Sequence, residues 1–438
     1  MKSSEKLSTM PSIIPKKLSL YFAILSFLGF VDASYLSIEH FLGKIPPCSI
    51  IKGCDIVTTS SYSVVAGVPI AFVGAIYYLI IFLCSIALII NPRALFNRII
   101  KILIPIGFVT SLYLVYVQIA VLKAICLYCM FSATISLLFM LGLVSIINFK
   151  IIYKYILKPI FFLIRPETIH DIMTYFGSFL GKYSFFRTIT RKLFDYKNVI
   201  LEQTILGINF KNPIGLSAGF DKNAQLTDII PFVGFGFIEV GSITGKPCVG
   251  NAKPRLWRLK ELKGLIVYYG LKNNGSRAIA NKLRNKTFAI PTGTSIAMTN
   301  CQENLNIENA IEDYAVAFKE FVSIGDYFTI NISCPNAQGG QPFIDPIKLD
   351  NLLKKIDEIN TKKPIFVKLS PDLSEKVVDD ILLVLKKHRV HGIICTNLTK
   401  NKNGKGGISG KSVQNLSDNL LAYIYKKEKD SVTLIGCG

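Results

Sequence analysis

Four long runs of apolar residues in the first third of the chain most constrain what it can fold into. They cover about residues 18–38, 69–90, 102–122 and 126–147. Each run is long enough for an α-helix that crosses a hydrocarbon layer, which needs about 20 residues. A cleaved signal peptide would supply one such run and not four. The sequence therefore predicts an all-α bundle of four transmembrane helices.

Basic residues at the ends of these runs predict how the helices are oriented. The N-terminal tail, the loop after the second run and the segment after the fourth run are basic, whereas the other two loops are poorer in Lys and Arg for their combined length. Cytoplasmic loops carry the excess of basic residues in membrane proteins. We therefore expect a multi-pass membrane protein with both termini in the cytoplasm.

Four cysteines fall at the predicted outer edge of the bundle. Cys48 and Cys54 lie in the first outer loop, and Cys126 and Cys129 begin the fourth helix. Disulfide chemistry is possible on this oxidising side. A helix N-terminus stabilises a thiolate, and the Cys-x-x-Cys spacing lets one sulfur resolve a mixed disulfide on the other. We expect thiol–disulfide exchange here, whereas Cys84 in mid-helix is expected to serve packing only.

The order of these residues resembles the bacterial form of the vitamin K epoxide reductase family over about residues 17–149. The matching motifs are Cys48-x5-Cys54-x5-Ser60, a Gly-Val-Pro before the second helix, and Cys126-Leu-Tyr-Cys129. The resemblance implies a bundle around a quinone, ubiquinone or menaquinone, with Cys126 and Cys129 beside the ring. It also implies that Cys48 and Cys54 receive electrons from a thioredoxin-like partner outside. Ser60 matches a serine near the quinone, and an ordinary helix cap is an equal alternative for it.

The remainder of the chain has a different pattern. After a basic linker at 150–164 and an amphipathic helical extension at 165–206, short β-branched runs alternate with helical stretches. The expected strands are 214–218, 236–240, 295–298, 328–332, 365–369, 392–396 and 433–437. This alternation predicts a parallel α/β fold, and polar residues at the ends of several strands suggest the catalytic face of a (β/α)8 TIM barrel over 207–438.

This second part resembles dihydroorotate dehydrogenase, especially its membrane-associated, quinone-reducing class. The matching motifs are Ser217-Ala-Gly-Phe-Asp-Lys222-Asn223, Glu239-Val-Gly-Ser242, Lys253-Pro-Arg-Leu-Trp-Arg-Leu259, Asn331-Ile-Ser-Cys334-Pro-Asn336, Val367-Lys368-Leu-Ser-Pro-Asp372, Thr396-Asn397 and Gly406-Gly-Ile-Ser-Gly410. The resemblance implies a flavoprotein of pyrimidine biosynthesis that oxidises dihydroorotate to orotate with a quinone as acceptor. The extension at 165–206 would lie on the membrane and admit the quinone.

Carried over position by position, the resemblance implies one site for FMN and one for a dihydropyrimidine substrate. FMN would be held by Ala218, Gly219, Lys222, Ser242, Asn331, Lys368, Thr396 and Gly410. The substrate would be held by Lys222, Asn331, Asn336 and Asn397, because amides both donate to and accept from a pyrimidine edge. Lys368 would stabilise negative charge on the flavin. Cys334 stands at the position of the catalytic base, and we expect a neighbour such as Lys222 to lower its pKa.

Several features depart from the family pattern. The quinone-reducing class has serine as the base, whereas a cysteine such as Cys334 is typical of the cytosolic class. Val267 stands where the family has an asparagine that contacts orotate, and the segment 295–300 lacks the usual asparagine spacing. The chain stops after the seventh expected strand. We therefore expect a barrel that is incomplete at its C-terminus, in a chain that is a fragment.

Charge and composition exclude some other functions. The chain has 50 Lys and Arg residues against 29 Asp and Glu residues. The basic residues of the N-terminal part lie at the ends of the apolar runs and form no basic face with interspersed aromatic residues, which argues against nucleic-acid binding. We expect a fusion of two oxidoreductases that share the membrane quinone pool, without a metal site. One alternative is a thiol–quinone bundle that anchors a degenerate or differently specific flavin domain. A small-molecule transporter is disfavoured, because few charges besides Asp32 lie within the apolar runs.

Overall fold

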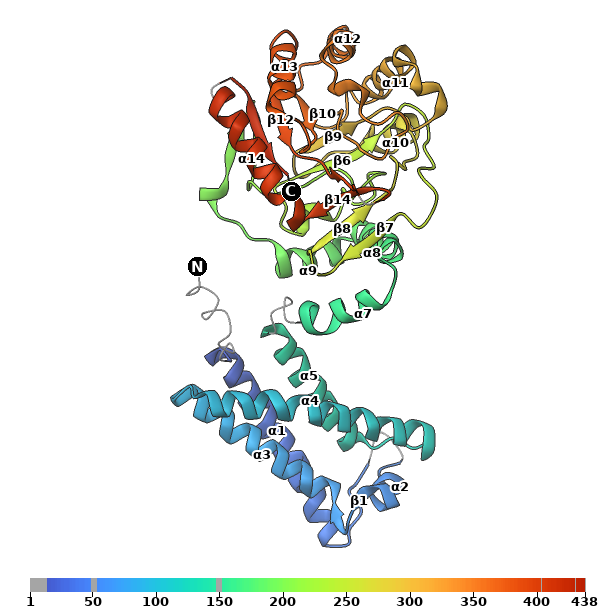
Figure 1. The fold of residues 1–438 in the computed structure, drawn as a ribbon. Coiled ribbons are helices and arrows are strands. Elements are labelled where there is room, and N and C mark those ends of the chain that lie inside the picture. Colours follow the sequence, from blue (N-terminus) through green and yellow to red (C-terminus); the bar gives the residue numbers. More distant parts are fainter. Residues whose placement is uncertain (1–13, 49–52, 147–151, 403, 430, 438) are drawn as a thin grey trace. The chain divides into compact units, whose positions relative to one another are not determined.

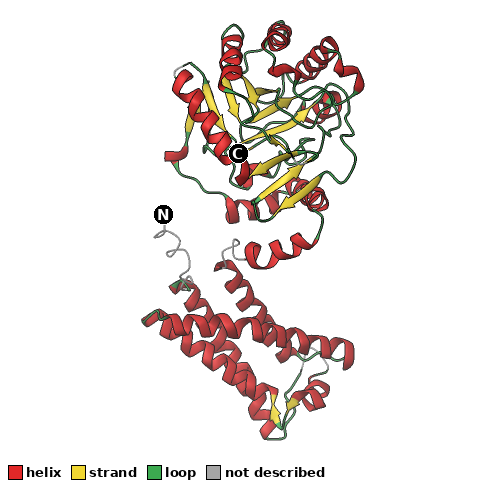
Figure 2. Ribbon diagram, in the orientation of Figure 1, coloured by secondary structure: helices red, strands yellow, loops and turns green. Residues whose placement is uncertain are grey.

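The computed structural model of the protein describes residues 14–48, 53–146, 152–402, 404–429 and 431–437. The chain divides into two compact units, Met1–Tyr155 and Ile156–Gly438. The first unit is almost entirely helical, and the second combines helices with a sheet (Figures 1 and 2). Most of the expected tail at 1–16 and the first two residues of the expected linker lie outside the described residues.

Four long helices make up most of the first unit. They are α1 (Lys16–Phe41), α3 (Ile70–Ile90), α4 (Ala94–Tyr116) and α5 (Leu127–Ile146), and α4 continues in a π-helical turn, η3 (Val117–Val121). All four are long and apolar enough to cross a membrane, which confirms the predicted helices. Helix α4 begins eight residues before the third apolar run, because its first turns contain basic residues and are not part of the uncharged run.

The bundle is closed by aromatic side chains packed against small ones. Helices pack in the cyclic order α1, α3, α4, α5. Phe22 of α1, Tyr78 of α3 and Phe139 of α5 are buried, and their rings lie 5.7 Å (Phe22–Phe139) and 6.2 Å (Tyr78–Phe139) apart. A Cβ on Gly29 of α1 would come within 2.6 Å of the Tyr78 ring. Helices α1 and α3 can therefore approach closely only because position 29 has no side chain.

The outer surface of this bundle is apolar. Large hydrophobic side chains are exposed along each long helix, among them Leu20, Phe27, Leu79, Val109 and Leu141. Backbone polar groups are satisfied inside the helices, so such a surface is stable against lipid and unfavourable in water. The segment between α1 and α3 holds short elements instead: α2 (Cys54–Thr59), η2 (Ser61–Ser63) and a hairpin of β1 (Val64–Val65) and β2 (Val68–Pro69).

The second unit begins with helices and a small hairpin. These elements are η4 (Tyr153–Leu157), α7 (Lys158–Leu163), α8 (Pro166–Lys182), α9 (Ser184–Phe194), η5 (Val199–Leu201), β3 (Gln203–Ile205) and β4 (Ile208–Phe210). The expected helical extension is therefore broken at Tyr183, whose backbone is extended. The Tyr183 ring packs against Phe179 of α8 and Phe186 of α9, so the break gathers the aromatic side chains of both helices.

A seven-stranded parallel sheet forms the centre of the second unit. Its strands are β5 (Gly215–Leu216), β6 (Phe237–Ile243), β9 (Thr292–Ile296), β10 (Tyr327–Asn331), β11 (Ile365–Leu369), β12 (Gly392–Cys395) and β15 (Thr433–Gly436). Neighbours in the sheet follow the order of the chain, which is the arrangement of a TIM barrel, and all seven expected strands are present. Within the described residues the edge strands are β5 and β15.

Helices cover the outer face of this sheet (Figure 1). They are α10 (Ser276–Leu283), α11 (Ile307–Glu320), α12 (Pro346–Asp357), α13 (Glu375–Leu385) and α14 (Lys411–Glu428), with short turns η6 (Ile230–Phe232), η7 (Gln302–Leu305) and η8 (Pro342–Ile344). The core lies between sheet and helices, where Phe318 of α11 stacks on Phe328 of β10 at 4.0 Å. Asp345 caps α12 by accepting from the backbone N–H groups of Ile347 and Lys348.

A second, antiparallel sheet was not expected from the sequence. It has the order β13 (Thr399–Lys400), β14 (Gly407–Gly410), β8 (Gly264–Val267) and β7 (Leu256–Leu259). Arg255, just before β7, holds the start of α8, because its Nη2 lies 2.5 Å from Glu167 Oε1 and both side chains are nearly buried. Arg258 of β7 donates to the carbonyl oxygens of Phe161 and Ile164. This sheet therefore fixes the helical extension.

We expect Glu167→Ala to weaken the docking of α8 by about 3 kcal/mol, because it leaves the buried guanidinium of Arg255 without its partner. Burial alone would raise the pKa of Glu167, but the hydrogen bond and charge of Arg255 outweigh it and the pKa is lowered. The stabilisation is therefore present above the ordinary glutamate pKa of about 4.3 and is lost as the pH falls through the lower folded value. Thermal unfolding and proteolysis at 165–182 measure the effect.

The exposed pair Arg284–Glu320 provides the matched control for this prediction. Its Nη2–Oε2 distance is 3.3 Å and the Arg284 side chain is half exposed. Exposed pairs of this kind contribute about 0–1 kcal/mol, so Glu320→Ala should leave thermal unfolding almost unchanged. Equal effects of Glu167→Ala and Glu320→Ala would show that the buried pair does not hold α8.

Candidate functional sites

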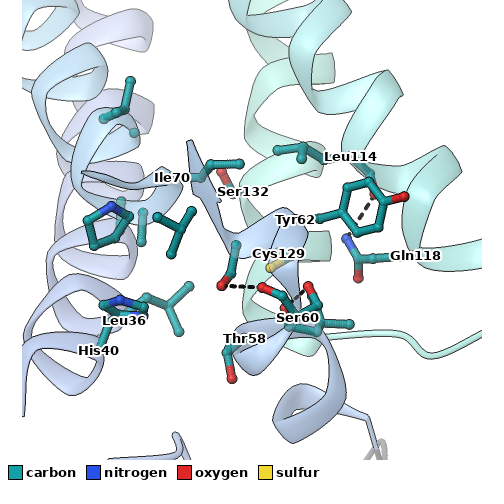
Figure 3. Close-up of a pocket in the computed structure, with 18 of the residues that line it drawn as sticks. Leu36, His40, Thr58, Ser60, Tyr62, Ile70, Leu114, Gln118, Cys129 and Ser132 are labelled. Carbon is teal, nitrogen blue, oxygen red and sulfur yellow. Dashed lines mark hydrogen bonds between the residues drawn. The ribbon is translucent and has the colours of Figure 1, made fainter. Parts of the chain in front are cut away.

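The first unit contains a cavity of about 560 Å³ (Figure 3). Its wall is formed by α1, α3, α4, η3, α5 and the segment that contains α2. Apolar groups form most of its surface, and many polar residues stand among them, including Asp32, His40, Lys44, Ser60, Tyr77, Gln118 and Ser132. Small-molecule sites have volumes of about 300–1,000 Å³ and this kind of lining. The cavity can therefore hold a ring-sized apolar molecule with polar substituents.

All four predicted outer cysteines gather beside this cavity. Cys54 and Cys126 are fully buried in one cluster, and Cys48 and Cys129 pack against it. Cys48 and Cys54 form a disulfide with Cα atoms 6.1 Å apart, while Cys126 and Cys129 are free thiols. Of the four, Cys129 lines the cavity (Figure 3). The arrangement brings a disulfide and a dithiol together next to a binding space, as thiol–disulfide exchange requires.

The local fold explains how Cys126 and Cys129 are held. Cys126 directly precedes α5, and its backbone N–H donates to Gln118 Oε1 at 2.9 Å. Gln118 lies in η3, so the π-helical turn at the end of α4 positions the start of α5. Cys129 packs against the cluster that contains the buried Cys126. Sequence reasoning identified both cysteines but missed Gln118, whose role depends on this irregular turn.

Ser60 and Cys84 have different surroundings. Ser60 follows α2 and lines the cavity, and its Oγ donates to the carbonyl oxygen of Val57 at 2.8 Å. Its side chain accepts no hydrogen bond from the backbone of the next turn, so it is not an N-cap in the usual sense. Cys84 lies in the middle of α3 within the bundle core and does not line the cavity.

In the second unit, predicted site residues from three strands meet at the carboxyl edge of the sheet. Asn331 at the end of β10 donates from Nδ2 to Ser242 Oγ of β6 at 2.8 Å. Asn397, which follows β12, donates from Nδ2 to Asn331 Oδ1 at 3.2 Å. These residues are far apart in the sequence and are joined in one hydrogen-bonded network. The network presents amide and hydroxyl groups at the end where TIM-barrel enzymes hold their ligands.

Two further serines belong to this network and were missed. Ser295 Oγ lies 2.8 Å from Ser242 Oγ, and Ser333 Oγ donates to Asn331 Oδ1 at 2.9 Å. Asn397 Nδ2 also donates to Ser333 Oγ, at 3.0 Å. Ser295 lies in the segment that departs from the asparagine spacing of the family. Successive side chains of a strand point to opposite faces of the sheet, and this alternation along β9 was the available sequence signal for Ser295. In the structure, Ser295 is paired in register with Thr329 of β10.

Two buried titratable side chains, Lys368 and Glu239, lie on strands of the same sheet. Lys368 of β11 is 4% exposed, and its Nζ lies 3.8 Å from Cys437 Sγ. Glu239 of β6 is buried, accepts from Thr329 Oγ1 at 2.7 Å through Oε2, and has no hydrogen-bond partner at Oε1 within the described structure. Burial raises the pKa of Glu239, and the charge of Lys368 opposes this. Glu239 lies within a recognised motif, but no role was expected for it.

Lys222 and the turn at Ala218–Gly219 lie at the first strand. Lys222 Nζ donates to the carbonyl oxygen of Gly219 and lies 4.0 Å from the centre of the Tyr269 ring. Burial, and then the charge of Lys272, lower the pKa of Lys222 to about 8. Gly219 has φ +104°, and a Cβ there would meet no atom within 4 Å. The turn therefore leaves open space beside its backbone, into which a ligand could fit.

The loop after β10 holds Cys334 and Asn336. Burial raises the pKa of the Cys334 thiol to about 11, and the charge of Lys368 opposes this only weakly. The expectation that a neighbour such as Lys222 lowers this pKa is therefore wrong, because desolvation of the thiolate outweighs the nearby charge. Asn336 Nδ2 donates to the carbonyl oxygen of Val267 at 2.9 Å, and its buried Oδ1 has no partner in the described structure. That oxygen is available to accept from a ligand.

Thr396 and Gly410 complete the predicted set. The Thr396 backbone N–H donates to the carbonyl oxygen of Cys437 at 2.7 Å, which places it between the ends of β12 and β15. Gly410 has φ +88° and immediately precedes α14, and a Cβ there would come within 2.8 Å of Gly264. The N-terminus of a long helix such as α14 attracts anionic groups such as phosphate.

Comparisons with known proteins match both parts of the chain. The family model "Dihydroorotate dehydrogenase" matches residues 200–438, and the model "Vitamin K epoxide reductase family" matches residues 20–143. Dihydroorotate dehydrogenase (quinone) from Christiangramia forsetii is 37% identical over 303 residues, which cover 65% of this chain and 86% of that protein. The same enzyme from Buchnera aphidicola is 34% identical over 304 residues and is covered to 88%.

A solved structure matches part of the chain as well. The crystal structure of DHODH from Eimeria tenella in complex with ferulenol has a TM-score of 0.54 and 25% sequence identity. The match covers 62% of this chain and 79% of the Eimeria chain. The two family matches confirm both resemblances that the motifs indicated.

Proposed function

We propose that this chain, which belongs to the dihydroorotate dehydrogenase family and also carries a domain of the vitamin K epoxide reductase family, joins two quinone-reducing enzymes in one membrane protein. On the cytoplasmic side it would oxidise dihydroorotate to orotate. On the outer side of a bacterial inner membrane it would oxidise protein thiols to disulfides. Both activities would pass electrons to the membrane quinone pool, and no direct connection between them is needed.

The single observation that best supports the dehydrogenase is the network that joins Ser242, Asn331 and Asn397 from three strands, with the buried Lys368 paired in register with Asn331. The open space at Gly219, the position of Gly410 before α14 and the hydroxyls of this network suit FMN. When bound, FMN accepts a hydride from the substrate and delivers electrons to the quinone. The holding residues would be Ala218, Gly219, Lys222, Ser242, Asn331, Lys368, Thr396 and Gly410.

The substrate would lie against the amides and the first-strand lysine. Asn336 offers a buried carbonyl oxygen without a partner, which can accept a ring N–H of a dihydropyrimidine. Asn397 offers an amide in the same network, and the Lys222 ammonium can pair with the substrate carboxylate. Cys334 would take the proton from the ring carbon as general base. Val267 contributes its carbonyl oxygen to Asn336, although its side chain lacks the amide of the family.

In the bundle, two thiols of a thioredoxin-like partner would reduce the Cys48–Cys54 disulfide and become a disulfide themselves. Exchange with the neighbouring pair would then restore that disulfide and leave Cys126 and Cys129 reduced. A quinone in the cavity that Cys129 lines would reoxidise them. The two thiols lose two electrons and two protons, and the quinone takes up these two electrons and two protons to become a hydroquinone.

Purified protein in detergent tests the dehydrogenase directly. We expect a flavin absorbance spectrum and dihydroorotate-dependent loss of a soluble quinone with an equal amount of orotate formed. Folded protein that binds flavin without oxidising dihydroorotate would favour the differently specific flavin domain, which the change at Val267 would explain. Folded protein with neither property would refute the proposed dehydrogenase.

The proposed orientation predicts a difference in thiol labelling. After reduction of intact cells, a membrane-impermeant thiol reagent should label Cys48 and should not label Cys334, because the two lie on opposite sides of the membrane in this orientation. Permeabilised cells provide the control, since Cys334 is then within reach of the reagent. Labelling of Cys334 but not Cys48 in intact cells would invert the orientation.

A further inference from the structure

Asp32 is a carboxylate inside an apolar helix, and the functions described so far do not use it. It lies near the middle of α1, which is long and apolar enough to span a membrane. Ionisable groups inside membrane-spanning helices are rare, face cavities or partners, and mark ion or proton pathways. Asp32 lines the 560 Å³ cavity of the bundle, together with Cys129.

The surroundings of Asp32 do not explain it as a structural residue. Its Oδ2 is buried and has no hydrogen-bond partner, and the described residues include no cation within ion-pair distance of it. A buried carboxyl oxygen without a hydrogen-bond partner is costly, so packing alone does not explain the presence of Asp32. The titratable groups nearest to it are Cys126 and Cys129 at the start of α5 and Tyr78 of α3. The same cavity wall also carries His40, Lys44, Tyr62 and Tyr77.

The chemistry proposed for the cavity needs a group that moves protons. Forming the Cys126–Cys129 disulfide makes one S–S bond and breaks two S–H bonds, while the quinone gains two electrons and two O–H bonds. The cavity is largely apolar, and the thiols and the quinone oxygens are different sites within it. A carboxyl that faces both can accept a proton from one and donate it to the other.

We propose that Asp32 is the proton-transfer residue of this quinone site. It takes a proton released by the Cys126–Cys129 pair and gives it to a quinone oxygen, and it returns to its starting state after each transfer. The carboxyl group of Asp32, which lines the cavity together with Cys129, carries the proton. This inference rests on the proposed thiol:quinone activity of the bundle.

The test is the rate of quinone reduction by the chemically reduced full chain in detergent. Asp32→Asn keeps the shape of the side chain but cannot transfer a proton in this way, so we expect the rate to fall about 100-fold, the scale of losing a general acid–base group. Asp32→Glu should recover at least about a tenth of the wild-type rate. Glu39→Gln, on the same helix but outside the cavity, is the matched control and should leave the rate unchanged.

A second readout separates proton transfer from a structural role. Reduction of the Cys48–Cys54 disulfide by an added thiol should proceed at the wild-type rate in Asp32→Asn, and during turnover Cys126 and Cys129 should accumulate as alkylatable thiols. A wild-type rate of quinone reduction in Asp32→Asn, or an Asp32→Glu as slow as Asp32→Asn, would overturn the inference. If the wild-type protein reduces no quinone with thiols, the proposed activity of the bundle itself fails.

Discussion

Cells that depend on this protein for disulfide formation should lose it completely when Cys129 is replaced by alanine. Cys129 lines the cavity and packs against the cluster that contains Cys126. Without it, a mixed disulfide on Cys126 has no resolving sulfur and no electrons reach the quinone. Cys126→Ala should have the same effect. The measurement is the oxidation state of a secreted reporter protein that contains one essential disulfide.

Cys84→Ala is the matched control for this result. Cys84 is a buried cysteine of the same bundle that packs in its core and does not line the cavity. Its replacement should leave reporter oxidation close to the wild-type level. Near-normal oxidation in Cys126→Ala or Cys129→Ala would refute the proposed thiol relay.

Cys334→Ala should slow reduction of the bound flavin by dihydroorotate about 100-fold or more, while flavin stays bound, because the proposed general base is lost. Burial raises the pKa of Cys334 to about 11. At any pH below that value, the fraction of Cys334 present as thiolate increases about tenfold for each unit by which the pH increases. The wild-type rate should therefore increase steadily from pH 6 to 9. Cys334→Ser should keep partial activity with its pH dependence moved upward. Stopped-flow absorbance of the flavin measures these rates.

Cys301→Ala is the control for the base, because Cys301 is a partly buried thiol of the same unit and belongs to none of the hydrogen-bonded groups of the site. Its flavin reduction should follow the wild-type pH profile. A Cys334→Ala protein that reduces flavin at the wild-type rate from pH 6 to 9 would show that Cys334 is not the base.

The arrangement of elements was predictable because it follows from local patterns. Uncharged runs of membrane-spanning length predict helices, and β-branched runs that alternate with helical segments predict parallel strands. The break at Tyr183 and the π-helical turn that holds Gln118 were not predictable in this way. Both depend on contacts that form only on folding, such as the ring packing around Tyr183 and the hydrogen bond from the Cys126 backbone N–H to Gln118 Oε1.

The candidate sites show the same limit. Motifs identified Asn331 and Ser242 separately, but their hydrogen bond and the participation of Ser295 come from strand register. The pKa of Cys334 was expected to be lowered by a nearby lysine, whereas it is raised. Motif spacing indicates which residue types are near one another, but it does not measure how far burial removes water from a thiolate. Desolvation is a property of the folded chain as a whole.

One measurement tests most directly whether this chain joins two quinone-reducing enzymes. It is the rate of quinone reduction by each of two electron donors, measured on one purified sample in quinone-containing vesicles. Wild-type protein should reduce the quinone with dihydroorotate and, separately, with a reduced thioredoxin-like protein. Cys129→Ala should lose only the thiol-dependent rate, and Cys334→Ala only the dihydroorotate-dependent rate. Wild-type protein that uses only one donor, or a single one of these substitutions that removes both rates, would contradict two independent modules sharing one quinone pool.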